Sequence, residues 1–211
     1  MKVQLLCDSV SSWIIPYAQN LAKDLVKQGY EAILLTEQKD VVSGDILILL
    51  SCEQLFKKLN LNKHNLVIHE SDLPKGKGWS PLTWQVLEGK HRIPVTLFEA
   101  EEHVDSGPVY NQVFIELDGT ELIDELRTKQ FEATRILIVD FIQKYPDIVP
   151  VAQQGLSSFY SRRRPVDSLL DISKPLQEQF NLLRVCDNER YPAYFEQNGV
   201  KYILKIYKVS E

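Results

Sequence analysis

Short apolar runs separated by a helical pattern fill the first third of the chain. These runs are residues 3–7, 31–35, 45–50 and 66–68. Continuous apolar runs of this length are typical of strands buried in a parallel sheet. Between the first two runs, Ile14, Tyr17, Leu21 and Leu25 recur at helical spacing. This β-α-β alternation predicts an α/β fold with a Rossmann-like, mostly parallel sheet and flanking helices.

The rest of the chain shows weaker patterns and a change of character near residue 150. The elements we expect there are a short helix at 53–59, a strand at 108–117, a long helix at 120–145, a helix from 171 or 173 to 184, and two strands within 194–209. Asn198-Gly199 is a strong signal for a two-residue hairpin. We therefore expect one domain over 1–150 and a small segment with a helix and a β-hairpin over 151–211.

Composition narrows the class of protein. The net charge of −5 over 211 residues argues against nucleic acid as the main partner, because phosphate binding needs clustered positive charge. No apolar stretch approaches the roughly 18 residues of a membrane span, and the start lacks the pattern of a signal peptide. The three widely spaced cysteines show no metal-binding spacing, so we assign them to core packing and expect a cytoplasmic location.

The stretch from residue 66 to residue 107 carries the candidate chemistry. Its first apolar run ends on His69, and its second strand leads into a loop that ends at Asp105, 36 residues later. Ligands of α/β proteins bind outside such strand ends, so we expect an active site formed by these two loops. No Gly-x-Gly-x-x-Gly follows the first strand, which argues against a dinucleotide site.

These motifs resemble the 10-formyltetrahydrofolate-dependent formyltransferases, a family that includes methionyl-tRNA, glycinamide ribonucleotide and sugar-nucleotide enzymes. The matching positions are His69, Ser71, Leu73, Pro74, Gly78, Pro81, Val95, Thr96, Asp105, Ser106 and Gly107. The resemblance covers about residues 3–145. The segment SFYSRRRPVDSLLD, with the later Tyr191-Pro192 and Gly199, is similar to the segment after the catalytic domain in the sugar-nucleotide enzymes.

The resemblance implies a function and its partners. The expected reaction moves a formyl group from 10-formyltetrahydrofolate to the amine of a nucleotide-linked amino sugar, without a metal. A UDP-linked 4-amino-4,6-dideoxy sugar on a pseudaminic-acid-type route to a surface glycan is the first specific choice. The C-terminal segment would bind this substrate or form a homodimer. The alternatives are a formyltransferase acting on another amine, and a non-catalytic folate or nucleotide-sugar binding protein.

The catalytic roles also come from the resemblance. His69 would donate to the oxyanion of the tetrahedral intermediate, and Asp105 would pair with His69 and pass on the amine proton. The family has an oxyanion-binding Asn two residues before the histidine, and this chain has Val67 there. Ser71 or a loop N–H can replace that donor, the enzyme can tolerate a slower step, or the site can be degenerate.

The binding residues fall into two sets. The pterin would lie between two loops and contact Leu50, Ser51, Cys52, Glu102, His103, Val104 and Asp105. The acceptor would contact Glu70, Asp72, Lys77, Trp79, Tyr160, Arg162 and Arg163. Arginine forks match phosphate oxygens, and an aromatic ring can stack on a base. Simpler roles stay open: the acidic residues and lysines can be solvated, and the arginines can pair with Asp167 or Asp171.

Overall fold

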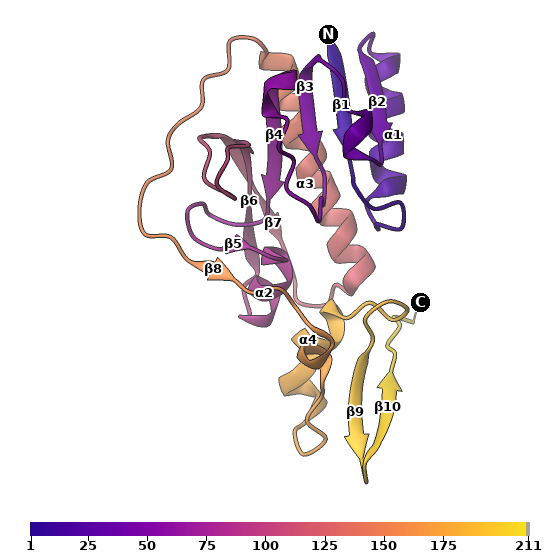
Figure 1. The fold of residues 1–211 in the computed structure, drawn as a ribbon. Helices are drawn as coiled ribbons and strands as arrows, with labels where there is room; N and C mark the ends of the chain where they lie inside the picture. The colour runs from indigo at the N-terminus through magenta and orange to yellow at the C-terminus, as the bar shows by residue number, and fades with distance from the viewer. Residues whose placement is uncertain (210–211) are drawn as a thin grey trace.

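A six-stranded sheet forms the centre of the computed structural model, which describes residues 1–209 (Figure 1). Its strands are β1 (Lys2–Leu6), β2 (Glu31–Leu35), β3 (Gly44–Leu49), β4 (Asn62–His69), β6 (Arg92–Glu99) and β7 (Val109–Glu116), in the order β2-β1-β3-β4-β6-β7. The first four strands in this order pair in parallel, whereas β6 is antiparallel to β4 and β7 is antiparallel to β6. The predicted mostly parallel sheet is confirmed.

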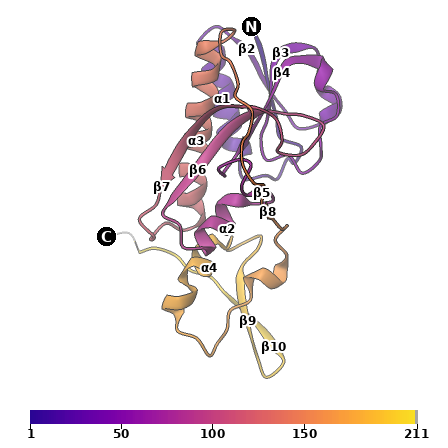
Figure 2. The same cartoon turned by 90° about the vertical axis from the view of Figure 1, so that its left-hand side faces the viewer.

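The two faces of the sheet are covered differently. Helices α1 (Ile15–Lys27) and α3 (Ile123–Lys144) pack side by side on one face, where Tyr17 contacts Phe131 (Figure 2). Loops cover the other face, and Phe56 fills a smaller apolar cluster there. Because side chains alternate along a strand, β4 sends Leu66 into the helix-side core and Asn65 toward the loop side, where its amide donates to the carbonyl of Leu59. We call these the helix face and the loop face.

Two predicted helices are absent or shortened. Residues 53–58 form an irregular loop instead of a helix. Two long-range contacts hold this loop: the carboxylate of Asp8 accepts hydrogen bonds from the backbone N–H groups of Glu53 and Gln54, and Phe56 packs into the apolar cluster of the loop face. The expected helix over 171–184 is reduced to α4 (Phe180–Val185), preceded by a 3-10 turn (Leu176–Gln179). There the Gln179 side chain bonds both backbone groups of Asp171, which closes a loop in place of a helical turn.

After residue 150 the chain first crosses the main unit and then forms a small core of its own. Strand β8 (Phe159–Tyr160) pairs with β5 (Lys77–Gly78), which lies just before the short helix α2 (Pro81–Leu87). The hairpin of β9 (Ala193–Gln197) and β10 (Val200–Leu204) follows, with Asn198-Gly199 at its turn as predicted (Figure 1). None of the helices within residues 1–209 combines the length and apolar composition that crossing a membrane requires.

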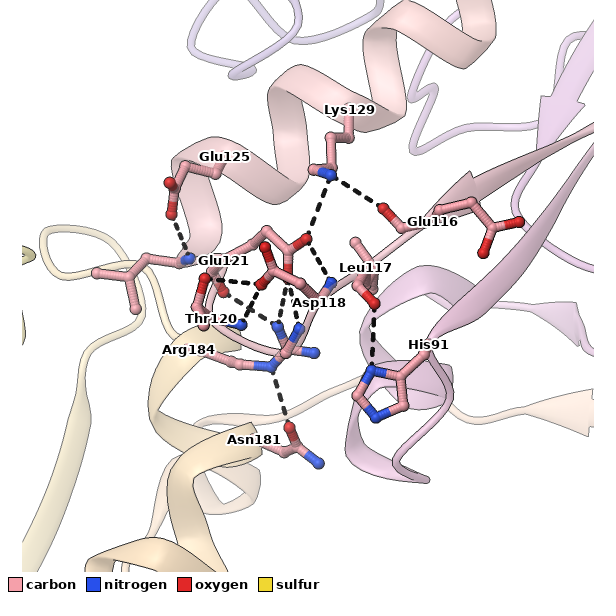
Figure 3. Close-up of polar contacts among 12 residues, drawn as sticks. His91, Glu116, Leu117, Asp118, Thr120, Glu121, Glu125, Lys129, Asn181 and Arg184 are labelled. Carbon is pink, nitrogen blue, oxygen red and sulfur yellow. Dashed lines mark hydrogen bonds and ion pairs between the residues drawn. The ribbon is translucent and has the colours of Figure 1, made fainter.

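A buried ion pair joins α4 to the start of α3 (Figure 3). Arg184 is 1% exposed, and its guanidinium lies 3.1 Å from the carboxylate of Glu121, which also accepts hydrogen bonds from the backbone of Asp118 and Gly119. Burial raises the pKa of Glu121, but these hydrogen bonds and the one from Lys129 outweigh it and lower the pKa to about 2. This cluster fixes the C-terminal segment against the main unit.

We expect Glu121 to make the fold acid-sensitive. Its carboxylate stabilises the native state above about pH 4.5, and this contribution is lost as the pH falls toward 2; the shift corresponds to up to about 3 kcal/mol. Glu121→Gln leaves Arg184 buried without its charge partner, so it should lower the melting temperature at pH 7 and flatten the decrease between pH 5 and pH 3. Thermal unfolding followed by circular dichroism measures both effects. Equal acid sensitivity in this variant and in the exposed control Glu196→Gln would contradict the assignment.

Candidate active site

A cavity of about 820 Å³ surrounds the end of β4. Val67 and His69 line it from the loop face, and Ile68 and Glu70 line it from the helix face. Residues 51–56 and 100–105 form its wall on the loop side, apart from Glu102, which does not reach it. On the helix side the wall comes from α3, from α4 and from the residues that follow α4. The volume lies in the range of sites that hold drug-sized ligands.

His69 is held against the loop that precedes α2. Its Nε2 donates to the carbonyl of Gly76 at 2.9 Å and lies 3.8 Å from Oδ2 of Asp105. That same Oδ2 accepts a hydrogen bond of 2.8 Å from the backbone N–H of Gly78. Both side chains are 9% exposed, so the pair is largely shielded from solvent but still opens to the cavity. The structure thus brings two of the three predicted catalytic side chains, His69 and Asp105, together.

The route by which Asp105 reaches His69 differs from the predicted one. Since β6 is antiparallel to β4, its last residue lies beside Leu66 and not beside His69. The loop 100–108 turns back instead, and Gln153 fixes it by donating to the carbonyls of Asp105 and Gly107. Asp105 itself has a left-handed backbone with φ of 53°. The two residues are neighbours because of this loop, not because two parallel strands end at one edge.

Several other predicted residues line the cavity. These are Ser51, Cys52, Glu70, Trp79, His103, Val104, Arg162 and Arg163. Arg162 lies over the ring of Trp79, with its guanidinium carbon 4.4 Å from the centroid, and pairs with Glu53 at 3.4 Å. Arg163 donates to the backbone carbonyl of Asp167 and not to its carboxylate, so the alternative ion pair of the arginines with Asp167 or Asp171 is not found among residues 1–209.

Six predicted residues lie outside the lining of the cavity: Leu50, Ser71, Asp72, Lys77, Glu102 and Tyr160. Leu50 is part of the helix-side core. Ser71 is buried, and its hydroxyl has no hydrogen-bond partner among residues 1–209, so it does not supply the expected donor to the cavity. Asp72 bonds Gln112. The hydroxyl of Tyr160 donates to Glu88, and its ring stacks on Trp84 instead of facing a ligand.

Five residues at the far, helix-side end of the cavity were not predicted from the sequence. Trp13, Arg127, Asp187, Arg190 and Tyr191 line it there. Arg127 pairs with Asp187 at 2.7 Å, and the side chain of Arg190 donates to the carbonyl of Ser11. No local motif marks these residues because they come from three distant segments. In the described part of the chain, no group of three or more His, Cys, Asp or Glu side chains is arranged to hold a metal ion.

Cys52 in the cavity wall should be unreactive. Burial, reinforced by the nearby charge of Asp8, raises the pKa of its thiol to about 12, and the Sγ donates to the carbonyl of Leu6. Cys52 is partly exposed but has this raised pKa, and Cys7 and Cys186 are buried, so iodoacetamide at pH 8 should label none of the three cysteines in the native protein and all three in denaturant. Mass spectrometry after labelling reads this directly. Rapid native labelling of Cys52 would show that the thiol is more exposed than the structure has it.

Comparison with known proteins places this geometry in a family. Residues 21–142, more than half of the chain, match the family described as Formyl transferase. A methionyl-tRNA formyltransferase of Pseudothermotoga lettingae is 32% identical over 123 residues, which are 57% of this chain and 40% of that protein. The matched part therefore spans well under half the length of that relative.

Two solved structures share the fold over nearly the whole chain. HypX from Aquifex aeolicus in complex with tetrahydrofolic acid superposes with a TM-score of 0.82 at 17% identity, over 98% of this chain and 37% of that one. A sugar N-formyltransferase from Shewanella sp FDAARGOS_354 superposes with a TM-score of 0.69 at 16% identity, over 100% and 99% of the two chains. At such identities these likenesses concern the fold. By the match over residues 21–142, the chain belongs to the formyl transferase family.

Proposed function

We propose that the protein is an N-formyltransferase that uses 10-formyltetrahydrofolate. The observation that carries this proposal is the His69–Asp105 pair, 3.8 Å apart and facing a cavity of about 820 Å³ in a chain of the formyl transferase family. A histidine beside a fixed carboxylate can stabilise developing negative charge and move a proton, which are the two tasks of formyl transfer.

The formyl donor would lie on the loop face. There the cavity wall contains Phe98 and Val67, which present apolar surface to a pterin, and backbone groups of residues 51–56 and 101–105 lie around them. The bound tetrahydrofolic acid in the HypX structure supports this choice of donor. Of the predicted pterin contacts, we keep Ser51, Cys52, His103, Val104 and Asp105.

The reaction would follow from the positions of the two side chains. The neutral amine of the acceptor attacks the formyl carbon, and the carbonyl oxygen becomes an oxyanion beside His69. Asp105, oriented by the backbone N–H of Gly78, stabilises the imidazolium and directs an amine proton toward N10 of the folate as the C–N10 bond breaks. Val67 cannot donate a hydrogen bond, so we propose a backbone N–H of the 100–105 loop as the second oxyanion donor.

A nucleotide-linked amino sugar is the acceptor that we favour. Five arginines line the cavity, namely Arg127, Arg162, Arg163, Arg164 and Arg190. Trp13 and Tyr191 lie at the same end as Arg190 and offer faces for a base, while the guanidinium groups match the oxygens of a diphosphate. The fold shared with a sugar N-formyltransferase supports this acceptor. A UDP-linked 4-amino-4,6-dideoxy sugar for a surface glycan, made in the cytoplasm, stays our first choice.

Two alternatives have specific support. The likeness to a methionyl-tRNA formyltransferase favours a different amine as acceptor, although the net charge of −5 is unfavourable for binding RNA. Val67 at the usual Asn position favours a degenerate binding protein, since losing one oxyanion donor typically slows such reactions by ~10²–10³. The division at residue 150 and a homodimer through the C-terminal hairpin remain proposals as well.

Turnover of 10-formyltetrahydrofolate with a panel of UDP- and dTDP-linked amino sugars tests the function. His69→Asn and Asp105→Ala should each lower kcat by about 10² or more, because they remove charge stabilisation that the transition state requires. The matched control is His91→Asn, whose imidazole bonds the carbonyl of Leu117 away from the cavity and which should retain wild-type rates. If His69→Asn and Asp105→Ala both turned over the substrates at the wild-type rate, the roles assigned to these residues would be refuted. Tight folate binding without turnover of any amine would favour the binding protein.

A further inference from the structure

Glu70 is a buried carboxylate that forms no ion pair among residues 1–209. The residue is 9% exposed, and its Oε1 accepts a hydrogen bond of 2.7 Å from the side-chain amide of Gln130 on α3. Among residues 1–209, no lysine, arginine or histidine side chain lies within ion-pairing distance of it. Burying an ionised group without a partner costs several kcal/mol, and the bond from one neutral amide offsets only part of this cost. The side chain nevertheless lines the cavity, where a ligand can reach it.

Glu70 lies on the side of the cavity where we place the acceptor, and not on the side where we place the formyl donor. Successive side chains of β4 point to opposite faces, and Glu70 continues the series on the helix face, beside Gln130 and Leu126 of α3. The proposed pterin site is on the loop face with Val67, and the end of the cavity lined by Arg127 and Arg190 is on the helix face with Glu70. We place the anionic part of the acceptor at Arg190. The rest of the acceptor would then extend past Glu70, and its reactive nitrogen would reach the formyl carbon beside His69.

We infer that Glu70 binds the ammonium group of the acceptor and takes its proton, an inference that rests on the proposed formyl transfer. Amino sugars carry an ammonium group near neutral pH, and this group cannot attack a carbonyl carbon. One N–H bond of the ammonium breaks and an O–H bond forms on Glu70, which leaves a neutral amine beside His69. Of the two protons that the ammonium loses, Glu70 later releases one to water, and N10 of the folate receives the other.

The electrostatics of the site suit this step. Burial raises the pKa of Glu70, while His69 and the hydrogen bond from Gln130 lower it and Asp105 raises it further. A carboxylate with a raised pKa is a stronger base than an exposed one and lies closer to the pH at which the enzyme works. The charged and histidine side chains that line the same cavity include His69 on β4, Asp105 on the 100–108 loop and Arg127 on α3. The others are Glu53, Glu101, His103, Arg162, Arg163, Arg164, Asp187 and Arg190. Activity should therefore fall as Glu70 becomes protonated at low pH.

Glu70→Gln separates this role from a structural one. The variant keeps the shape of the side chain and an oxygen for Gln130 but removes the charge. It should fold with an equal or higher melting temperature, because an unpaired buried carboxylate is gone. The matched control is Glu132→Gln, which removes an exposed carboxylate from the same helix as Gln130.

Calorimetry with two probes measures the recognition of the amine. The measurements are made in the presence of tetrahydrofolate at pH 7. The wild type should bind a UDP-linked 4-amino-4,6-dideoxy sugar ~10-fold or more tightly than its 4-hydroxy counterpart, because one hydrogen bond to a charged group contributes about this much affinity. Glu70→Gln should lose this preference while binding UDP alone as the wild type does. For the wild type and Glu132→Gln, kcat/KM should fall as the pH is lowered. For Glu70→Gln, this decrease at low pH should be absent.

The outcomes decide between the possibilities. A Glu70→Gln protein that keeps the preference for the amine, or the wild-type pH profile, would overturn the inference. A marked loss of stability would do so too, since it would show that Glu70 is needed for folding. If the wild type formylated no amine in the panel, the proposed function itself would fall and the inference with it. Wild-type turnover with an unchanged Glu70→Gln variant would leave the function standing and reject only the role of Glu70.

Discussion

The alternation of side chains at the end of β4 is the constraint on which the site depends. His69 and Glu70 are consecutive, so a strand must send them to opposite faces of the sheet, and the cavity curves around the strand end to meet both. One face is covered by loops and the other by helices. In the proposed reaction, the formyl donor and the acceptor would therefore approach one point from two sides, with an imidazole on one side and a carboxylate on the other.

Two sets of contacts fix the walls of the cavity, one on the loop side and one on the helix side. On the loop side, Gln153 and the N–H of Gly78 fix the 100–108 loop so that Asp105 reaches His69. On the helix side, the Glu121–Arg184 pair fixes α4 and the residues after it, which supply the far wall of the cavity (Figure 3). Both supports link segments that are distant in sequence, so the site exists only in the folded chain and includes parts of both predicted units.

Local patterns were sufficient to predict the sheet, α1, α3 and the hairpin, because strand and helix periodicity and the Asn198-Gly199 turn are properties of short stretches. The helix expected at 53–59 is absent, and its residues are held as a loop by Asp8, 45 residues away from Glu53, a contact that no local pattern reveals. The same limit applies to the site. His69 and Asp105 stood out by their motifs, whereas Arg127 and Arg190 could be found only from their shared cavity.

The most direct test of the account is a crystal structure with tetrahydrofolate and a UDP-linked 4-amino-4,6-dideoxy sugar bound together. We predict that the pterin lies on the loop face between residues 51–56 and 101–105, and that the sugar nitrogen lies within hydrogen-bond distance of Glu70, with His69 beside N10. The nucleotide should lie toward Arg190. A sugar bound on the loop face, or a nitrogen remote from both His69 and Glu70, would contradict the account.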